Sequence, residues 1–159
     1  MTNQEILDAL TAALPGSILR HEEFRDDLTV VVRRDDIVRV AEFVKTRLGF
    51  DLVIDVLGVD QYRAAARYEV VYNVYALQHK RYLRLKVTAE EEHPVVPSVT
   101  GVWPGANWHE RETFDMFGIR FEGHPDLRRM YMPEEFDYHP LRKDFPLLGI
   151  PDSLPLPRR

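Results

Sequence analysis

The sequence contains no cysteine among its 159 residues. The lack of thiols excludes disulfides, thiolate nucleophiles, zinc ribbons and cysteine-ligated iron–sulfur clusters within this chain. No apolar run approaches the ~20 residues needed to span a bilayer, and the N-terminus has no signal-peptide pattern. A G-x-S-x-G elbow, a P-loop and a G-x-G-x-x-G motif are also missing. These absences remove the commonest nucleophilic and nucleotide-binding sites.

Length and charge describe an ordinary globular chain of single-domain size. The 159 residues, 45% hydrophobic and 30% charged, are enough to bury a real core. The formal net charge of −5 argues against general nucleic-acid binding, which needs a basic surface. We therefore expect a soluble protein with no nucleic-acid partner, which could still sit on a membrane complex.

Up to residue 89, the hydrophobic pattern alternates between helix and strand. A capping box from Thr2 to Glu5 opens a helix that Pro15-Gly16 ends, and Gly49 is placed to end a second helix over residues 35–48. Strands are predicted at residues 17–24, 28–33, 50–58, 67–77 and 81–89. The order α-β-β-α-β-β-β predicts an α+β fold, with a sheet covered by helices on one face.

The character of the chain changes after residue 89. Residues 107–118, "NWHERETFDMFG", predict a short helix that Asn107 caps together with Glu110, and that Gly118 ends. Residues 122–159 carry seven of the eleven prolines but keep aromatic and aliphatic residues, which disordered segments usually lack. We therefore expect an α+β domain at residues 1–121 and an extended C-terminal arm at residues 122–159.

The arm is too long to stay beside its domain unless it folds back. In polyproline-like geometry its 38 residues would reach roughly 120 Å, whereas a domain of this size has a radius of gyration of only ~15 Å. The arm therefore wraps its own domain, lies across a neighbouring protein, or is disordered. Its apolar residues, spaced between prolines, favour a partner protein.

The charged helix has two features that an ordinary solvated helix would not need. Trp108, Arg111, Glu112 and Asp115 share one arc, and the simplest interpretation is an exposed polar face. However, Glu110 lies near the apolar side, where a buried carboxylate needs a hydrogen-bonding partner. Asp115 lies in the last turn, where the helix dipole disfavours an anion. Both features favour an interface.

Catalytic and metal-binding interpretations of this helix are weaker. His109 and Glu112 form a single H-x-x-E pair, whereas di-metal bundles need two such pairs and further carboxylates. His124 and His139 are each followed by proline and have no regular ligand spacing. Two alternatives stay open: a stand-alone enzyme that uses His109 and Glu112 as acid and base, and a free adaptor that binds a partner peptide with its sheet edge.

Residues 110–131, "ERETFDMFGIRFEGHPDLRRMY", resemble the signature of the thirty-kilodalton subunit family of respiratory complex I. In bacteria this is the C-type subunit of the NADH–quinone oxidoreductase. The resemblance rests on the 110–112 Glu-Arg-Glu triplet, residues 115–117, His124, Arg128 and the pair at 130–131. "HPLRKDFPL" at residues 139–147 and "DVLGVDQY" at residues 55–62 are also similar to this family.

This resemblance implies a two-layer α+β domain with a mixed sheet, followed by a short helix and a long arm. It also implies a non-catalytic, single-copy subunit of the peripheral arm, on the cytoplasmic side of a bacterial membrane or the matrix side of a mitochondrial one. The chain itself would hold no cofactor. FMN, iron–sulfur clusters and quinone would belong to neighbouring subunits. Among these are the forty-nine-kilodalton, D-type subunit together with the iron–sulfur subunits of the B and I types.

Within such an assembly, we expect the charged helix and the arm to contact partners. The arginines would pair with partner carboxylates, the acidic residues would receive donors, and the aromatic residues would be buried anchors. The expected interface residues are Trp108, Glu110, Arg111, Glu112, Asp115, His124, Arg128, Tyr131, Phe136, Tyr138, His139, Arg142, Lys143, Asp144 and Phe145. The chain would then brace the quinone-site and iron–sulfur subunits during electron transfer from NADH to quinone, which such complexes couple to proton translocation.

One alternative lies close to this interpretation. Membrane-bound hydrogenases and ferredoxin- or F420H2-linked dehydrogenases use related subunits. No residue of this sequence contacts an electron donor, so the sequence leaves that alternative open.

Overall fold

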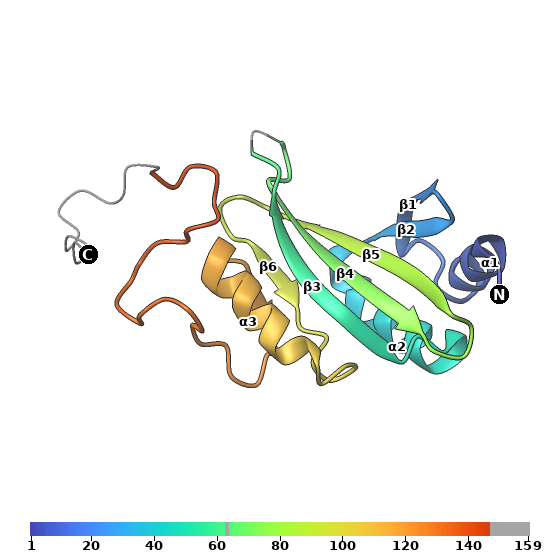
Figure 1. The fold of residues 1–159 in the computed structure, drawn as a ribbon. Helices are drawn as coiled ribbons and strands as arrows, with labels where there is room; N and C mark the ends of the chain where they lie inside the picture. The colour runs from blue at the N-terminus through green and yellow to red at the C-terminus, as the bar shows by residue number, and fades with distance from the viewer. Residues whose placement is uncertain (63, 147–159) are drawn as a thin grey trace.

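A computed structural model describes residues 1–62 and 64–146 (Figure 1). The first half of the chain contains α1 (Asn3–Ala13), β1 (Ile18–Phe24), β2 (Asp27–Val32), the 3-10 turn η1 (Arg34–Asp36) and α2 (Ile37–Leu48). The second half contains β3 (Leu52–Asp60), β4 (Tyr68–Ala76), β5 (Arg81–Ala89), β6 (Val95–Pro97), α3 (Ala106–Phe117) and β7 (Arg120–Glu122). The predicted order of the first seven helices and strands is confirmed.

Local sequence signals set the ends of several elements. The Thr2 hydroxyl accepts a bond from the Glu5 backbone N–H at 3.2 Å, and the Glu5 carboxylate accepts one from the Thr2 N–H at 2.8 Å, which confirms the capping box. Arg25 and Asp26 both have positive φ (49° and 67°), as a two-residue hairpin turn between twisted strands requires. Gly49 ends α2 with φ of 72°.

The main sheet has five strands in the order β1-β2-β5-β4-β3. β2 pairs with β5 in parallel, with Val30 opposite Leu85, and the other neighbouring pairs are antiparallel. The expected α+β fold with a mixed sheet is therefore confirmed. The parallel pair joins two strands separated by α2 and two other strands, which a crossover connection makes possible.

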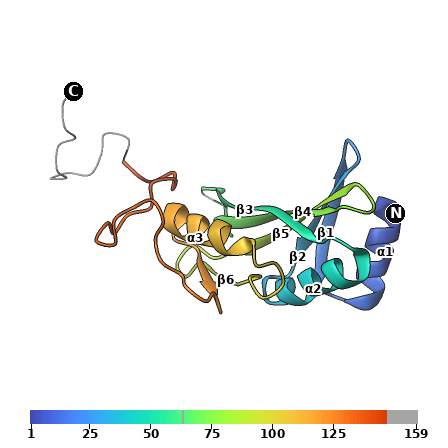
Figure 2. The same ribbon diagram turned by 60° about the horizontal axis from the view of Figure 1, so that its bottom comes forward.

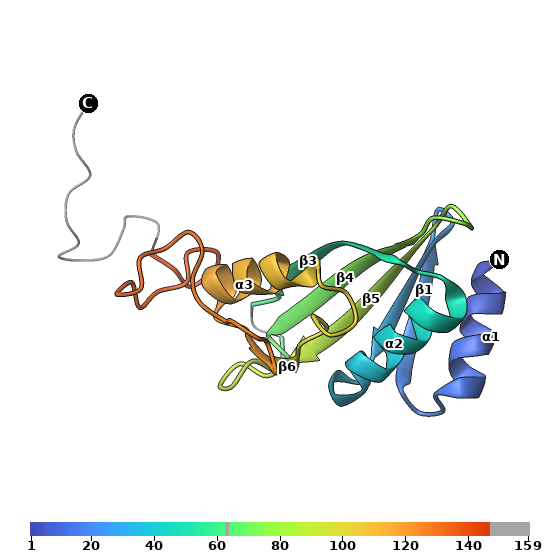
Figure 3. The same ribbon diagram turned by 90° about the horizontal axis from the view of Figure 1, so that it is seen from below.

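Helices cover one face of this sheet, as the element order predicts. Tyr68, Val70, Tyr72, Val74 and Ala76 all point from β4 into the core and are fully buried. The same core contains the apolar faces of α1 and α2 and residues of the β6–α3 segment. Figures 2 and 3 show α2 and this segment on the same side of the strands, while the other face of the sheet carries no helix.

In the edge strand β3, buried and exposed side chains do not alternate as they do in a regular strand. Leu52 and Ile54 are 41% and 45% exposed, whereas Val56 is buried. The pairing with β4 shifts between Val53 and Asp55. Such a bulge turns the side chains before it away from the face that a strict period of two would give them.

Helix α3 packs against β3 at the end of the molecule away from α1 (Figure 1). A Cβ on Gly58 would lie 2.5 Å from the Phe117 ring and 2.9 Å from the Thr113 methyl, so only glycine allows this approach. The Thr113 hydroxyl donates to the Val56 carbonyl oxygen at 3.1 Å. The short parallel pair β6–β7 flanks α3. None of the helices in the described ranges is long and apolar enough to cross a membrane.

Candidate partner interface at helix α3 and the C-terminal arm

Helix α3 begins two residues earlier than expected and without the expected cap. Gly105 is its N-cap residue, and no side chain caps the helix, so the prediction that Asn107 caps it is wrong. The Glu110 carboxylate instead accepts bonds from the Ser98 hydroxyl at 2.6 Å and from the Val99 N–H at 2.8 Å. Glu110 therefore fastens the loop before α3 to the helix.

Glu110 is completely buried and has no cationic partner within the described chain. Burial raises its pKa from 4.5 to about 7, although the bonds from Ser98 and Val99 oppose the shift. The buried carboxyl group therefore keeps its proton to a higher pH than an exposed glutamate does. The sequence predicted correctly that a carboxylate beside the apolar face of α3 needs hydrogen-bonding partners, but these partners come from the same chain.

Asp115, in the last turn of α3, is also completely buried. One carboxylate oxygen accepts bonds from three successive backbone N–H groups, those of Met130 (3.0 Å), Tyr131 (2.7 Å) and Met132 (3.1 Å). The other accepts a bond from the Arg129 guanidinium at 2.7 Å. Burial alone would raise the pKa of Asp115, but these four donors outweigh it and hold the pKa below its ordinary value. They also explain why an anion is tolerated at this end of the helix.

The arm also satisfies the carbonyl groups at the end of α3, which have no partner inside a helix. His139 Nδ1 lies 2.9 Å from the Asp115 carbonyl oxygen, and the Leu141 N–H donates to the Met116 carbonyl oxygen at 3.1 Å. Arg142 Nε donates to the Phe117 carbonyl oxygen at 2.6 Å. The helix C-terminus is therefore closed by the arm, with the Arg142 cation at its negative pole.

Gly118 makes this closure possible. It ends α3 with φ of 76°, as the sequence predicts. A Cβ at this position would collide with the Arg142 guanidinium and would lie 2.6 Å from the His139 ring. Glycine is therefore required both by the backbone conformation and by the close approach of the arm.

Arg111 holds the start of the arm through the backbone carbonyl groups of the arm. Its guanidinium donates to the carbonyl oxygens of Arg128 at 3.1 Å and Arg129 at 3.2 Å, and it lies 4.7 Å from the centre of the Trp108 ring. His124 Nε2 lies 3.1 Å from the Asn107 carbonyl oxygen, and His124 Nδ1 accepts the Asp126 N–H, so the hydrogen is on Nε2. These contacts fix the chain from residue 124 to residue 132 along α3.

A second attachment joins the arm to the end of the main sheet. Arg67 makes two bonds to Asp60, at 2.9 and 3.0 Å, and its guanidinium also pairs with Asp144 at 2.9 Å. The Lys143 N–H donates to Asp60 at 2.8 Å. Arg67 and Asp60 are 5% and 1% exposed. The hydrogen bonds from Arg67 hold the pKa of Asp60 far below its usual range, against the effect of burial.

The structure separates the expected interface residues into three groups: those bonded within the chain, those that face solvent, and those that are partly exposed. Glu110, Arg111 and Asp115 are buried within the chain, so it is the chain itself that supplies the partners expected from a neighbouring protein. Arg142 likewise bonds to Phe117. The side chains that face solvent are Trp108 (61% exposed), Arg128 (65%), Tyr131 (59%), Tyr138 (46%), Lys143 and Asp144 (48%). Glu112, His124, Phe136, His139 and Phe145 are partly exposed.

Up to residue 146, the arm packs against α3 and the adjoining end of the main sheet. The rest of the arm, from residue 147, lies outside the described residues. Phe136, Tyr138 and Phe145, expected as anchors for a partner, lie next to one another, with ring centres 5.7 and 6.4 Å apart around Tyr138. The described part thus presents a continuous surface in which α3 and the arm form one unit.

Sequence reasoning missed several residues that build this unit. Arg129, Arg67 and Asp60 carry the ion pairs, and Gly58 allows α3 to approach the sheet. Arg67 and Asp60 flank the β3–β4 connection, where no periodic pattern singles them out. Arg129, which pairs with Asp115, follows it by fourteen residues, a separation at which the helical pattern gives no signal.

The acid–base alternative has little structural support. Among the described residues, the side chain of His109 makes no hydrogen bond or ion pair, with Glu112 or with any other group. Glu112 borders a small hollow of about 150 Å³ beside Gly58 and Leu141, which His109 does not line. Among residues 1–62 and 64–146, no group of three or more His, Cys, Asp or Glu side chains could hold a metal ion.

Comparison with known proteins decides the family. Residues 30–150 match the model of the family described as "Respiratory-chain NADH dehydrogenase, 30 Kd subunit". The chain belongs to this family. Among its relatives, the C-type subunit of the NADH-quinone oxidoreductase of Roseiflexus sp. (strain RS-1) is 50% identical over 92% of this chain and 86% of its own length. The second C-type subunit of the same enzyme from Rhizobium meliloti (strain 1021) is 53% identical over 93% and 82%.

Solved structures agree with this assignment to the thirty-kilodalton subunit family. The trypsin-resistant fragment (1-134) of Nqo5 has a TM-score of 0.70 and 31% identity, over 80% of this chain and 100% of that one. A chain of the membrane-bound sulfane sulfur reductase, an archaeal respiratory membrane complex, has a TM-score of 0.79 over 91% and 86%. At 23% identity, that second likeness shows the fold alone.

Proposed function

We propose that this chain is a non-catalytic structural subunit of a proton-translocating NADH–quinone oxidoreductase. It braces the quinone-site and iron–sulfur subunits of the peripheral arm while electrons pass from NADH to quinone. FMN, iron–sulfur clusters and quinone are held by neighbouring subunits, and the isolated chain has no activity. The chain lies on the cytoplasmic side of a bacterial membrane, or on the matrix side of a mitochondrial one.

The main support is the identity of about half the residues with proteins named as C-type subunits of NADH-quinone oxidoreductases. The structure adds a physical argument. The two carboxylates of α3 that the sequence singles out, Glu110 and Asp115, are buried and bonded within the chain. The bonds of Glu110 fasten the loop before α3 to the helix, and those of Asp115 fasten the arm to it, so neither carboxylate is free to act on a substrate.

The outer surface of α3 and the arm is the proposed interface. Trp108, Tyr131 and Tyr138 expose between 46% and 61% of their surface, and Arg128 lies among them with 65% of its side chain exposed. Trp, Tyr and Arg are the residue types that most often carry binding energy in protein interfaces. The Trp108 ring is held in place by the Arg111 guanidinium, so little side-chain entropy is lost when a partner covers it.

We propose that the partners at this surface are the forty-nine-kilodalton, D-type subunit together with the iron–sulfur subunits of the B and I types. One copy of the chain is present in each complex. The sister assemblies built on the same fold are the second candidate, but the relatives that share half their residues with this chain are named as NADH–quinone oxidoreductases.

The test is affinity purification of the tagged full chain from its native membranes in mild detergent. Flavin and iron–sulfur subunits that co-purify with NADH–quinone reductase activity would support the proposal. Hydrogenase or ferredoxin-dependent activity would move the chain to a sister assembly. Trp108→Ala should lower recovery of the partners, whereas Leu19→Ala, an equally exposed apolar side chain on β1 (58%), should not. A chain recovered alone would contradict the proposal.

A further inference from the structure

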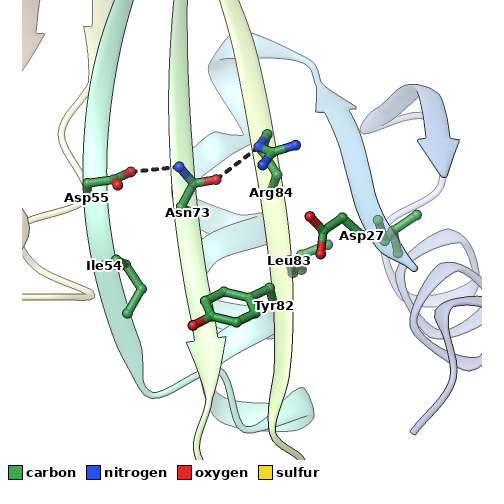
Figure 4. A pocket seen from close by; sticks show the side chains of 8 residues that line it. Asp27, Ile54, Asp55, Asn73, Tyr82, Leu83 and Arg84 are labelled. Atoms are coloured by element: carbon green, nitrogen blue, oxygen red, sulfur yellow. Dashed lines mark hydrogen bonds between the residues drawn. The ribbon is translucent and has the colours of Figure 1, made fainter. Parts of the chain in front are cut away.

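The face of the main sheet that no helix covers contains a hollow of about 350 Å³. Side chains from four neighbouring strands line it, and Figure 4 shows their arrangement. Those that carry polar or exposed groups are Asp27, Ile54, Asp55, Asn73, Tyr82 and Arg84. This hollow lies across β2, β5, β4 and β3, away from α3 and the arm, and the proposed interface does not use it.

A row of hydrogen bonds crosses the floor of this hollow. The Asn73 amide donates to Asp55 at 2.7 Å, and its oxygen accepts a bond from Arg84 Nε at 3.0 Å (Figure 4). Arg84 Nη1 continues the row to the Thr29 hydroxyl at 3.3 Å. The row joins β3, β4, β5 and β2, so the polar groups are held in fixed positions before any ligand arrives.

The row leaves two carboxylates with unused acceptor capacity. Only one oxygen of Asp55 is bonded, and the Asp27 carboxylate has no hydrogen-bond or ion-pair partner among the described residues. Arg84 already donates hydrogen bonds through Nε to Asn73 and through Nη1 to Thr29. The hollow therefore has two negative groups against one cation, and that cation is partly occupied. It suits a positively charged ligand better than an anion.

The walls are apolar and aromatic. Ile54 is 45% exposed on one side, and Tyr82 is 55% exposed on the other, where its ring packs 4.6 Å from that of Tyr75. An aliphatic stem can lie against these walls while its charged end reaches the carboxylates. A planar guanidinium fits best, because it stacks on an aromatic ring and bonds to a carboxylate with two N–H groups.

We propose that this hollow binds an arginine side chain projecting from a neighbouring subunit, so that the open face of the sheet is a second docking surface. A protein partner is favoured because exposed Leu52 (41%) and Leu57 (46%) extend the apolar surface along β3 beyond the hollow. This inference rests on the proposed function, since it requires that the chain belongs to a hetero-oligomeric complex.

The experiment is site-specific photo-cross-linking in the assembled complex. p-Benzoylphenylalanine replaces Tyr82 in the tagged full chain, the complex is irradiated in its membranes, and the cross-linked peptide is sequenced by mass spectrometry. The expected product joins Tyr82's position to a segment of another protein of the complex that contains arginine. A cross-link to a segment without arginine, or no cross-link in an otherwise complete complex, would overturn the inference.

Charge reversal provides the second measurement. Asp27→Arg should lower retention of the cross-linked partner in a salt wash by about tenfold, while Glu42→Arg, on the exposed side of α2, should leave retention unchanged. Replacing the cross-linked arginine of the partner with an acidic residue should restore retention of the partner by the Asp27→Arg chain. If Asp27→Arg only impaired folding, this second change would not restore retention. Unchanged retention in the Asp27→Arg complex contradicts the inference. If the unmodified chain co-purifies with no partner, the proposed function itself fails, and the two failures are thus distinguished.

Discussion

Replacing Asp115 with alanine gives the most direct test of how the arm is held. Its carboxylate accepts bonds from three backbone N–H groups of residues 130–132 and from the Arg129 guanidinium. Asp115→Ala removes the acceptor, so the three backbone N–H groups lose their partner and the Arg129 guanidinium keeps only its bonds to backbone carbonyl oxygens. We expect the arm to detach from α3 and the free energy of unfolding to fall.

The expected loss in the free energy of unfolding follows from the burial of these groups. Asp115 is fully buried and Arg129 is 12% exposed, and removing one member of a buried ion pair typically costs about 3–5 kcal/mol. The arm residues are partly exposed, so water can reach some of the released N–H groups and reduce the loss. We therefore expect about 3 kcal/mol, or a fall in Tm of roughly 10 °C for a chain of this length.

The loss is measured by urea unfolding of the purified chain, followed by circular dichroism, together with the rate of tryptic cleavage after residues 128, 129, 142 and 143. The variant should unfold at lower urea and be cut faster in the arm. Asp126→Ala is the matched control, because Asp126 pairs only with Arg128 on the surface, where such pairs contribute little. An unchanged midpoint and an unchanged cleavage rate for Asp115→Ala would refute the reasoning.

Three further predictions follow from single contacts. The raised pKa of Glu110 stabilises the fold below about pH 4.5, and this contribution is lost as the pH rises through about 7. Urea titrations across this range should therefore show the wild type losing about 3 kcal/mol relative to Glu110→Gln; parallel curves would contradict this. Gly118→Ala should lower Tm and speed cleavage of the arm, because φ is 76° and the new methyl meets Arg142 and His139; normal cleavage would argue against this closure. Gly58→Ala should separate α3 from β3 and reduce urea stability by about 1–3 kcal/mol, with no effect expected for Gly101→Ala, where the added Cβ meets nothing.

The sequence pattern was sufficient to predict those helices and strands whose signals lie within a few residues of one another. The capping box at Thr2, the αL glycines at the ends of α2 and α3, and the alternation in β4 and β5 involve neighbours within a few residues, so each could be identified in advance. The parallel pairing of β2 with β5 joins residues 55 positions apart and was not predicted; the family resemblance implied only that the sheet is mixed.

The details of the site depend on contacts that no local pattern shows. Asp115 meets backbone N–H groups of residues 130–132, and backbone donors leave no mark on the residue types. Asp60, Arg67 and Asp144 come together only because the arm returns to the end of the sheet. For these reasons the sequence identified the charged helix as important but assigned its buried carboxylates to a partner protein, whereas Glu110 is bonded to the loop before α3 and Asp115 to the arm.

The most direct test of the central claim compares assembly with turnover in membranes whose only copy of this chain carries Trp108→Ala and Tyr131→Ala. The amount of chain bound in the complex is quantified beside NADH–quinone reductase activity, with NADH–ferricyanide activity as a measure of the flavin-binding part. If the chain is a docking protein without catalytic groups, the amount of assembled complex should fall, and each assembled complex should turn over at the normal rate. Normal assembly with reduced turnover per complex would contradict this account, because these side chains would then take part in the reaction itself.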